Sequence, residues 1–301
     1  MQSEVTKTDF QTPGNLPFEV TRPAEQRVPF VFNSPHSGRQ YPASLLESSR
    51  LSSHALRRSE DVLVDELFSS VVEIGAPLLR ANFPRCWLDV NREPYELDPL
   101  LFNERLPGHA NSRSMRVAGG LGTIPRLVSE NQPIYQKAPQ LSDALWRIEN
   151  VYRPYHDALR KLIARTAVRF GHCVLVDCHS MPSRGGNKEQ GMRPDIIIGD
   201  RYGTSCHGDI SQELVRGFTQ LGYSATSNKP YAGGFITEHY GRPLKGLHTV
   251  QIEINRALYM DENTLKPKEG FSQLWDDIRK TMNALVSIPD SEFGPLAEAA
   301  E

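Results

Sequence analysis

The sequence predicts an α/β fold of three layers, in which helices cover both faces of a mixed, largely parallel sheet. Short apolar runs alternate with segments of helical periodicity along most of the 301 residues. Residues 173–178 and 195–198 are almost continuously apolar, which is typical of strands buried on both faces of a parallel sheet. We found no internal repeat. We therefore expect a single α/β domain over residues 27–288, with its site at the carboxyl ends of strands.

In the first half of the chain the apolar pattern predicts three elements and one long loop. Residues 27–33 form a short apolar run, and residues 56–74 carry apolar side chains at helical spacing up to Gly75, a typical helix end. Residues 85–92 alternate apolar and polar side chains as a strand does. The polar stretch 93–139 is rich in Gly, Pro and Asn, and so long a loop usually carries function or hides short elements.

The second half predicts longer elements. A helix is expected over residues 141–170, kinked or split by Pro154, because proline lacks the N–H that a helix interior needs. The remaining expected elements are strands at 173–178, 195–198 and 247–254 and helices at 207–221 and 267–285. The N-terminal segment 1–26 and the tail 289–301 lack periodicity, so we expect both to be loosely packed.

The composition excludes several classes of protein. A net charge of -2 argues against non-specific nucleic-acid binding, which depends on clustered Lys and Arg. No apolar run approaches the roughly 20 residues that cross a bilayer, and the polar start lacks the features of a signal peptide. We therefore expect a cytoplasmic protein without a membrane or nucleic-acid partner. Four cysteines with no CxxC pair disfavour a disulfide scaffold and an all-cysteine zinc site.

Familiar catalytic signatures are absent from the sequence. It contains no P-loop, no GxGxxG, no GxSxG and no HExxH, so nucleotide-binding, α/β-hydrolase and thermolysin-like functions lose support. Polar residues at expected strand ends remain as candidates, and each has a structural alternative.

Three of these groups follow or lie on apolar strands. His36 stands in SPHSG after the first strand, where a plain loop histidine is the alternative. His179 ends a buried strand with Asp177 two residues earlier, and such groups are costly there unless paired or ligating. Glu253 shares one face of the strand QIEIN with Gln251 and Asn255, a pattern that a half-exposed edge strand would also give.

Two further groups complete the set. Glu60 and Asp61 open the expected helix 56–74, where the helix dipole alone favours acids, but Asp61 also lies on a stripe that faces inward. Asn91 and Arg92 end the expected strand 85–92, and a guanidinium there suits bidentate capture of a carboxylate, with a structural salt bridge as the alternative.

Together these groups suggest a chemistry that none supports singly. Two histidines and one carboxylate, with a fourth position open for water, form the ligand set of catalytic zinc. The zinc-bound water would be the nucleophile, while a separate carboxylate takes its proton and later delivers it to the departing nitrogen. Glu253 is placed for that role.

Eight motifs in chain order resemble the N-formylglutamate amidohydrolase (deformylase) family over roughly residues 29–262. They are SPHSGRQYP, EDVLVDEL, WLDVNREP, YRPYHDAL, DCHSMP, GDRYGTSC, GGFITEHYG and QIEINRALYMDE. The family is similar in fold and site to zinc carboxypeptidases and aspartoacylase-like deacylases. The resemblance implies hydrolysis of N-formyl-L-glutamate to formate and L-glutamate, as in histidine degradation.

The resemblance also implies residue roles. One Zn²⁺ per chain would be bound by His36, Asp61 and His179, with Glu253 as general base and acid and with Asn91 and Arg92 reading a substrate carboxylate. Carboxypeptidases place the acidic ligand three residues after the first histidine, but position 39 here is Arg. Asp61 must then supply the carboxylate from another element, and Glu60 is its rival.

Other residues are expected to shape a pocket for an acidic N-acyl amino acid. Gly233 and Gly234 would let the backbone approach a ligand, although paired glycines are also common in turns. The remaining candidate substrate-binding residues are Tyr231, Thr237, His239, Arg193 and Arg256, with Arg85 and Arg126 as further arginines. Deacylation of another N-acyl amino acid, a carboxypeptidase-like amidase and a non-catalytic metal-binding homologue are the alternative functions.

Overall fold

The structure is a computed structural model that describes residues 5–129, 132–184 and 193–289. The chain divides into two compact units. Unit 1 comprises Met1–Glu19, Pro35–Val62 and Arg80–Ala158, and unit 2 comprises Val20–Ser34, Leu63–Leu79 and Leu159–Glu301. The expected tail after residue 289 lies outside the described residues, and the expected loose N-terminal segment contains two short strands, β1 (Thr6–Thr8) and β2 (Phe18–Thr21).

Unit 2 is built on a seven-stranded mixed sheet with the order β2-β5-β3-β6-β9-β7-β8. The further strands are β5 (Leu78–Ala81), β3 (Phe30–Ser34), β6 (Cys173–Met181), β9 (Leu247–Asn255), β7 (Ile196–Gly199) and β8 (Ala225–Ser227), and the unit boundary falls within β2 and β5. Strands β3, β6 and β9 are parallel, β7 is antiparallel to β9, and β8 is parallel to β7. The predicted α/β class with a mixed, largely parallel sheet is confirmed.

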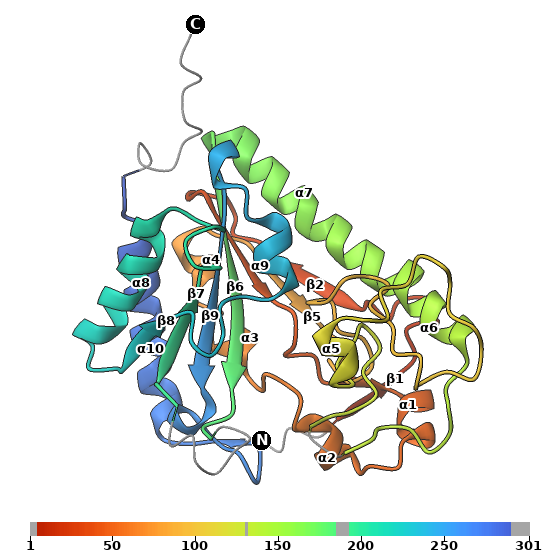
Figure 1. The fold of residues 1–301 in the computed structure, drawn as a ribbon. Helices are drawn as coiled ribbons and strands as arrows, with labels where there is room; N and C mark the ends of the chain where they lie inside the picture. Colours follow the sequence, from red (N-terminus) through yellow and green to blue (C-terminus); the bar gives the residue numbers. More distant parts are fainter. Residues whose placement is uncertain (1–4, 130–131, 185–192, 290–301) are drawn as a thin grey trace, which may run out of the picture. The chain divides into compact units, whose positions relative to one another are not determined.

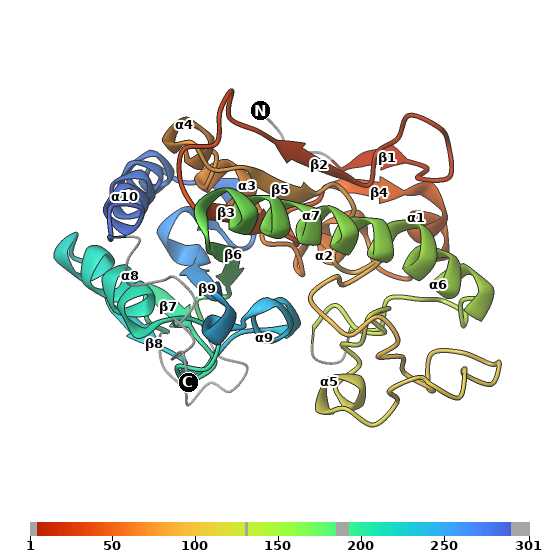
Figure 2. The same cartoon turned by 90° about the horizontal axis from the view of Figure 1, so that it is seen from above.

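Helices cover both faces of the sheet of unit 2 (Figures 1 and 2). On one face lie α3 (Val64–Leu67), α4 (Val71–Ile74), α8 (Gly208–Gln220) and α10 (Gly270–Leu285), and on the other lie α9 (Phe235–Tyr240) and the last part of α7 (Arg153–Phe170). All nine residues of β6 are buried, as expected for a central strand. Short elements complete the unit: η3 (Pro243–Lys245), η4 (Arg256–Leu258), β10 (Met260–Asp261) and β11 (Lys266–Pro267).

The strand that carries Glu253 is central in this sheet. β9 lies between β6 and β7, and each of its residues from the second onward is buried. The edge-strand alternative for this segment is therefore wrong. Its polar face, formed by Gln251, Glu253 and Asn255, is enclosed by protein, and buried polar groups require partners.

Unit 1 contains less regular structure. A parallel pair of β1 and β4 (Gln40–Pro42) is followed by α1 (Ala43–Ser48) and α2 (Ser53–Arg57), and α5 (Met115–Ala118) is a short helix inside the predicted long loop. Its core includes Tyr41, Leu45, Leu56 and Phe83, none of which has exposed surface. Residues 83–114 have no helix or strand, so their backbone polar groups need other partners.

Two predicted elements are wrong. The helix expected over 56–74 is broken into short pieces: α2 ends at Arg57, Leu63 adopts a left-handed conformation with φ 62° just before α3, and turns at residues 68–70 separate α3 from α4. The strand expected over 85–92 consists of turns. Its polar residues Asp89, Asn91 and Arg92 are buried together with their apolar neighbours, so the alternation does not separate two faces. Trp87 N donates to Pro84 O, and Asn91 N donates to the Asp89 carboxylate instead of to a neighbouring strand.

The helix expected over 141–170 is interrupted, as predicted from Pro154. It divides into α6 (Leu141–Arg147), a π-helical segment η1 (Ile148–Tyr152) and α7, whose first turn contains Pro154. Side chains from the unit 1 part of these helices stabilise the irregular segment 85–92. Arg147 donates to Trp87 O, Tyr152 Oη donates to Arg92 O, and His156 Nε2 lies 2.9 Å from Val90 O.

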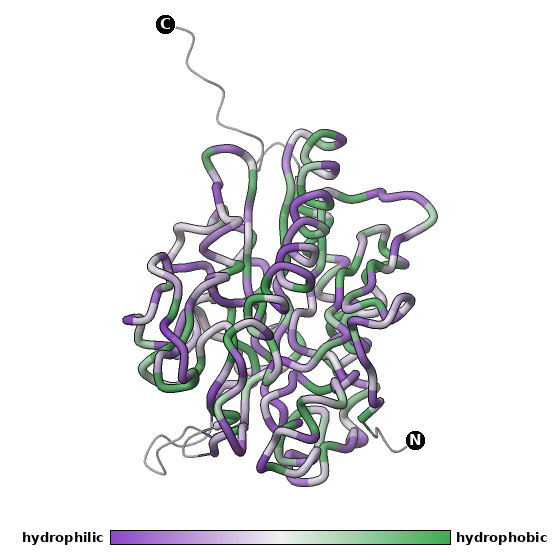
Figure 3. The backbone as a smooth tube through the Cα atoms, turned by 90° about the vertical axis from the view of Figure 1, so that its right-hand side faces the viewer, coloured by the Kyte–Doolittle hydropathy of each residue, from purple (hydrophilic) through white to green (hydrophobic). Residues whose placement is uncertain are grey.

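Hydrophobic and hydrophilic segments alternate along the backbone (Figure 3). Among the described residues, none of the helices combines the length and the apolar character that a membrane span requires. The four cysteines are free and buried. Burial, aided by Asp177, raises the pKa of the Cys178 thiol well above its usual value, in keeping with a small buried residue.

Candidate active site

In unit 1, His36 is held between two aspartates. Its imidazole is buried, with Nε2 2.8 Å from Asp89 Oδ1 and Nδ1 3.3 Å from Asp61 Oδ2. The backbone reinforces the second contact, because Asp61 N donates to His36 O at 3.0 Å. Asp61 and His36 are therefore tied together through both side chains and main chain. Sequence reasoning did not identify Asp89, which stands beside Asn91 and Arg92 but 53 residues from its histidine.

Asp89 is surrounded by cations. Arg85 Nε lies 2.9 Å from Asp89 Oδ2, and Arg92 Nη2 lies 3.6 Å from the same oxygen. Burial opposes ionisation, but Arg85, Arg92 and His36 outweigh it and hold the pKa of Asp89 well below its usual range. An ionised carboxylate can only accept a hydrogen bond, so His36 Nε2 donates to Asp89, while His36 Nδ1 faces Asp61.

Glu60 and Asp61 are neighbours with different partners. Glu60 accepts a hydrogen bond from Tyr41 Oη and one from Arg57 Nε at 3.0 Å, and it is buried. Burial raises the pKa of Glu60, although Arg57 and Tyr41 act in the opposite direction. The carboxylate of Asp61 faces His36. The contacts therefore distinguish the two candidate metal ligands: Asp61 faces His36, whereas Glu60 is bonded to Tyr41 and Arg57.

In unit 2, His179 repeats the arrangement found around His36. Its Nε2 lies 2.8 Å from Asp177 Oδ2, and Asp177 Oδ1 accepts a hydrogen bond of 2.7 Å from Asn33 Nδ2. All three side chains are buried, and Asn33 and Asp177 are register partners on β3 and β6. Both histidines thus present Nε2 to a buried carboxylate, and below we refer to His36–Asp89 and His179–Asp177 as the two histidine pairs.

Glu253 lies beside His179 on the sheet. The two residues are register partners on β9 and β6, so their side chains project from the same face. Glu253 is buried, with 8% of its surface exposed. Gln251 donates from Nε2 to Glu253 Oε1 at 2.9 Å. Glu253 is thus a buried carboxylate near the carboxyl end of a central strand, beside a candidate metal-binding histidine.

Arg92, which was predicted to bind a substrate carboxylate, already donates hydrogen bonds within unit 1. Arg92 Nε donates to Leu121 O and Arg92 Nη1 donates to Asn91 O, both at 2.8 Å. Burial is the main cause that lowers the pKa of Arg92 to about 10, so its guanidinium still carries charge at neutral pH. Arg85 is more accessible, with 28% of its side chain exposed, and Arg126 is paired with Asp98 at 2.7 Å.

In unit 2, Arg193 and Tyr231 pack together. Arg193 Nη1 donates to Tyr231 Oη, and the guanidinium carbon lies 5.1 Å from the centre of the phenol ring. Burial raises the pKa of Tyr231; Glu253 adds to this, and Arg193 and Arg256 counteract it. Arg256 is buried and donates from Nε to Ser180 Oγ at 3.0 Å. Tyr231 thus lies within electrostatic reach of Arg193, Arg256 and Glu253.

The glycines of the 231–239 segment allow close packing. Gly233 has a φ of 118°, and a Cβ there would lie 2.8 Å from Thr237 Cγ2, so a larger residue would be strained. Thr237 is fully buried against this turn. Gly234 N donates to Gln251 Oε1 at 2.8 Å. His239 stacks on Phe235 with ring centres 4.9 Å apart, and burial, Arg242 and Arg160 lower its pKa.

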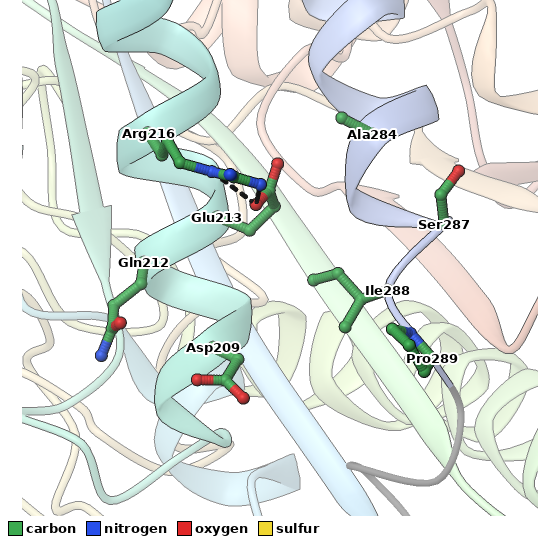
Figure 4. A pocket seen from close by; sticks show the side chains of 8 residues that line it. All are labelled: Asp209, Gln212, Glu213, Arg216, Ala284, Ser287, Ile288 and Pro289. Atoms are coloured by element: carbon green, nitrogen blue, oxygen red, sulfur yellow. Dashed lines mark hydrogen bonds and ion pairs between the residues drawn. The ribbon is translucent and has the colours of Figure 1, made fainter.

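A separate cavity of about 660 Å³ in unit 2 contains none of these residues. It lies between α8 and the end of α10, and its lining residues are Asp209, Gln212, Glu213, Arg216, Ala284, Ser287, Ile288 and Pro289 (Figure 4). Its position between two helices, away from the strand ends that carry His179 and Glu253, distinguishes it from the predicted site.

The mixed sheet and the two histidine pairs define an α/β protein whose buried histidines have the carboxylate partners typical of metal ligands. The chain matches the model of the N-formylglutamate amidohydrolase family over residues 28–260, and it belongs to this family. The family predicted from the eight motifs is confirmed, and the protein is accordingly a hydrolase of amide bonds.

Named relatives and solved structures agree with this membership. The chain is 28% identical over 239 residues to an N-formylglutamate deformylase of Pseudomonas putida, covering 78% of this chain and 83% of that one. It is 30% identical over 243 residues to an N-formylglutamate deformylase of Pseudomonas aeruginosa, covering 78% and 84%. The crystal structure of N-formylglutamate amidohydrolase from Ralstonia eutropha has a TM-score of 0.82 at 33% identity, covering 89% of this chain and 96% of that one. A gene product of Agrobacterium tumefaciens, with a TM-score of 0.58 at 19% identity and coverage of 91% and 96%, shares the fold.

Proposed function

We propose that the protein hydrolyses the amide bond of N-formyl-L-glutamate to formate and L-glutamate. Two relatives that match more than three quarters of the chain carry the name N-formylglutamate deformylase. The observation that carries the chemistry is the pair of buried histidines whose Nε2 atoms each face an aspartate. Metal-ligating histidines characteristically present one ring nitrogen to such a carboxylate and the other to the metal.

We further propose that His36 and Asp61 of unit 1 and His179 of unit 2 bind one Zn²⁺. The donor types fit: imidazole nitrogens and a carboxylate are common zinc ligands, and three protein ligands leave a position for water or substrate. His36 Nδ1 and Asp61 Oδ2 lie 3.3 Å apart, and both are atoms that can ligate the same cation. When bound, zinc would acidify water and polarise the formyl carbonyl.

In this proposal the residues around the ligands fix their orientation. Asp89 and Asp177 hold the two imidazoles through Nε2, which would direct Nδ1 of each ring to the metal. Asn33 fixes Asp177 in turn. Glu60, held by Arg57 and Tyr41, stabilises the turn that presents Asp61.

Glu253 is proposed to move the proton. It takes a proton from the attacking water as the water oxygen bonds to the formyl carbon, and it delivers that proton to the nitrogen as the C–N bond breaks. Formate and the free amine of glutamate leave, and the carboxylate is regenerated. The buried position of Glu253 beside His179 supports this role, because a general base must lie close to the reacting atoms.

The proposed substrate carries two carboxylates, and each can be bound by a separate cationic side chain. We propose that Asn91 and Arg92 read one carboxylate, and that Arg193 and Arg256 contribute to the second. The remaining residues proposed to shape the pocket are Tyr231, Gly233, Gly234, Thr237 and His239. The contacts of Tyr231 with Arg193 support its place in this group.

The test is to purify the protein, measure its bound metals, and assay formate or acid release from N-formyl, N-acetyl and N-succinyl derivatives of glutamate. We expect about one zinc per chain, loss of activity on chelation with recovery on adding Zn²⁺, and a preference for N-formylglutamate. Faster turnover of another N-acyl amino acid would overturn the substrate, and full activity in metal-free protein would overturn the zinc site. Absence of any hydrolysis with zinc bound would leave a non-catalytic metal-binding homologue.

A further inference from the structure

Gln251 occupies a buried position between two parts of unit 2. It lies on β9 two residues before Glu253, and because side chains alternate along a strand both project from the same face. Only 4% of its surface is exposed. A buried amide with four hydrogen-bonding positions is costly unless it is engaged, so its contacts indicate its role.

The amide of Gln251 makes one hydrogen bond in each direction. Its Nε2 donates to Glu253 Oε1 at 2.9 Å, and its Oε1 accepts from Gly234 N at 2.8 Å. The two partners fix the orientation of the amide, because a backbone N–H can only donate and an ionised carboxylate can only accept. Gln251 thus connects the carboxylate of Glu253 to the backbone at the start of α9.

The backbone at that point is itself held firmly. Gly199, at the end of β7, lies so close that a Cβ on it would approach Ala232 C to 2.8 Å. Arg201 N donates to Ala232 O at 2.8 Å. Gly233 packs against Thr237 in its left-handed conformation. Gly234 N is therefore a hydrogen-bond donor with a fixed position. Its bond orients the Gln251 amide, and the amide in turn orients the Glu253 carboxylate.

We infer that Gln251 is a positioning residue that holds the Glu253 carboxylate in the orientation needed for proton transfer. The inference rests on the proposed function, in which Glu253 is the general base. A hydrogen bond to a charged group is short and directional, and it selects one rotamer of the carboxylate. Without it the Glu253 carboxylate loses one of the contacts that fix its orientation, and small displacements of a catalytic group reduce the rate strongly.

The experiment compares Q251M, Q251E and a matched control in the zinc-loaded enzyme. Methionine has a similar length but offers neither hydrogen bond, and glutamate accepts from Gly234 N but places a second carboxylate beside Glu253. The control is T249V: Thr249 lies two residues earlier on the same face, is fully buried, and its hydroxyl has no hydrogen-bond partner among the described residues.

We expect Q251M to lower kcat by about 10- to 100-fold with little change in KM and with zinc content unchanged. Q251E should lower kcat further at neutral pH, because like charges repel. T249V should keep the kcat and KM of the wild type, and it reports what a buried substitution on this strand does to the melting temperature. Wild-type kcat in Q251M would overturn the inference, as would a raised KM at constant kcat, which would indicate a direct contact with substrate.

A second comparison separates this inference from the proposed function. E253Q should lower kcat by about 10²- to 10⁴-fold, and adding Q251M to E253Q should lower it no further, because Gln251 acts through Glu253. If E253Q retains full activity, the assignment of the base fails. If E253Q is impaired while Q251M is not, or if the two effects multiply, the role of Gln251 alone fails.

Discussion

The two histidine pairs have the same chemistry and different construction. In unit 2, His179 and Asp177 lie on one strand at a spacing of two residues, with Asn33 supplied by the neighbouring strand. In unit 1, His36 and Asp89 are 53 residues apart and both lie in irregular chain. A regular strand brings partners to one face by periodicity alone, whereas an irregular segment must be held by many separate side-chain contacts.

The difference extends to charge. Asp177 accepts a hydrogen bond from the neutral amide of Asn33. Asp89 instead forms an ion pair with Arg85 and lies near the guanidinium of Arg92. The His36–Asp89 pair thus depends on ion pairs in which the positive charges of Arg85 and Arg92 compensate the negative charge of Asp89. The removal of one charge there leaves the others uncompensated, and this gives the comparison measurable consequences.

The largest effect is expected when either histidine is removed. H36A and H179A should each reduce zinc content to background and lower kcat/KM by more than the 10- to 100-fold typical of losing an outer partner. Metal analysis of the purified variants with a formate-release assay measures both. Full zinc content in either variant would show that the ligand assignment is wrong.

Next in size is the contrast between the neighbouring acids. D61N should lose zinc and activity, because an amide is a poor substitute for the carboxylate that faces His36. E60Q should keep zinc but lower the melting temperature, because Arg57 then lacks its buried anion. Zinc content and thermal unfolding of both variants decide the assignment. If E60Q loses zinc and D61N retains it, Glu60 and not Asp61 is the zinc ligand.

The outer carboxylates should differ mainly in stability. D89N and D177N should each weaken zinc affinity by about 10- to 100-fold. D89N should also cost about 3 kcal/mol of unfolding free energy, since it breaks a buried ion pair, while D177N should cost less. Zinc titration with a chelating indicator and urea unfolding of the metal-free protein provide the two measurements. Equal losses of stability would contradict the distinction drawn between the two pairs.

The smallest effect is expected at Asn33. N33A removes the amide donor from Asp177 and should lower the unfolding free energy by about 1.5–3 kcal/mol, the range for hydrogen bonds to charged groups. Its zinc affinity should fall less than that of D177N, because the carboxylate still faces His179. Isothermal titration with Zn²⁺ compares the two variants, and an equal loss would mean that Asn33 and Asp177 act as one unit.

The sequence by itself determined the family, the α/β class and the regular elements of unit 2. The strands β3, β6 and β7 follow from continuous apolar runs, β9 from an alternation of apolar and polar residues, and the helices α8 and α10 from a period of about four residues. The same local logic placed Asp177 beside His179. It also predicted the interruption at Pro154, because the missing N–H of proline acts wherever it stands.

Tertiary structure alone decided unit 1 and the partners of the candidate residues. The alternation of residues 85–92 was mistaken for a strand because the polar Asp89, Asn91 and Arg92 are buried with their apolar neighbours and held by side-chain contacts. The contact of His36 with Asp89, the capture of Glu60 by Arg57 and Tyr41, and the bond of Gln251 to Gly234 join segments without a shared period. Such contacts depend on how distant segments of the chain pack together, so the spacing of residues in the sequence cannot predict them.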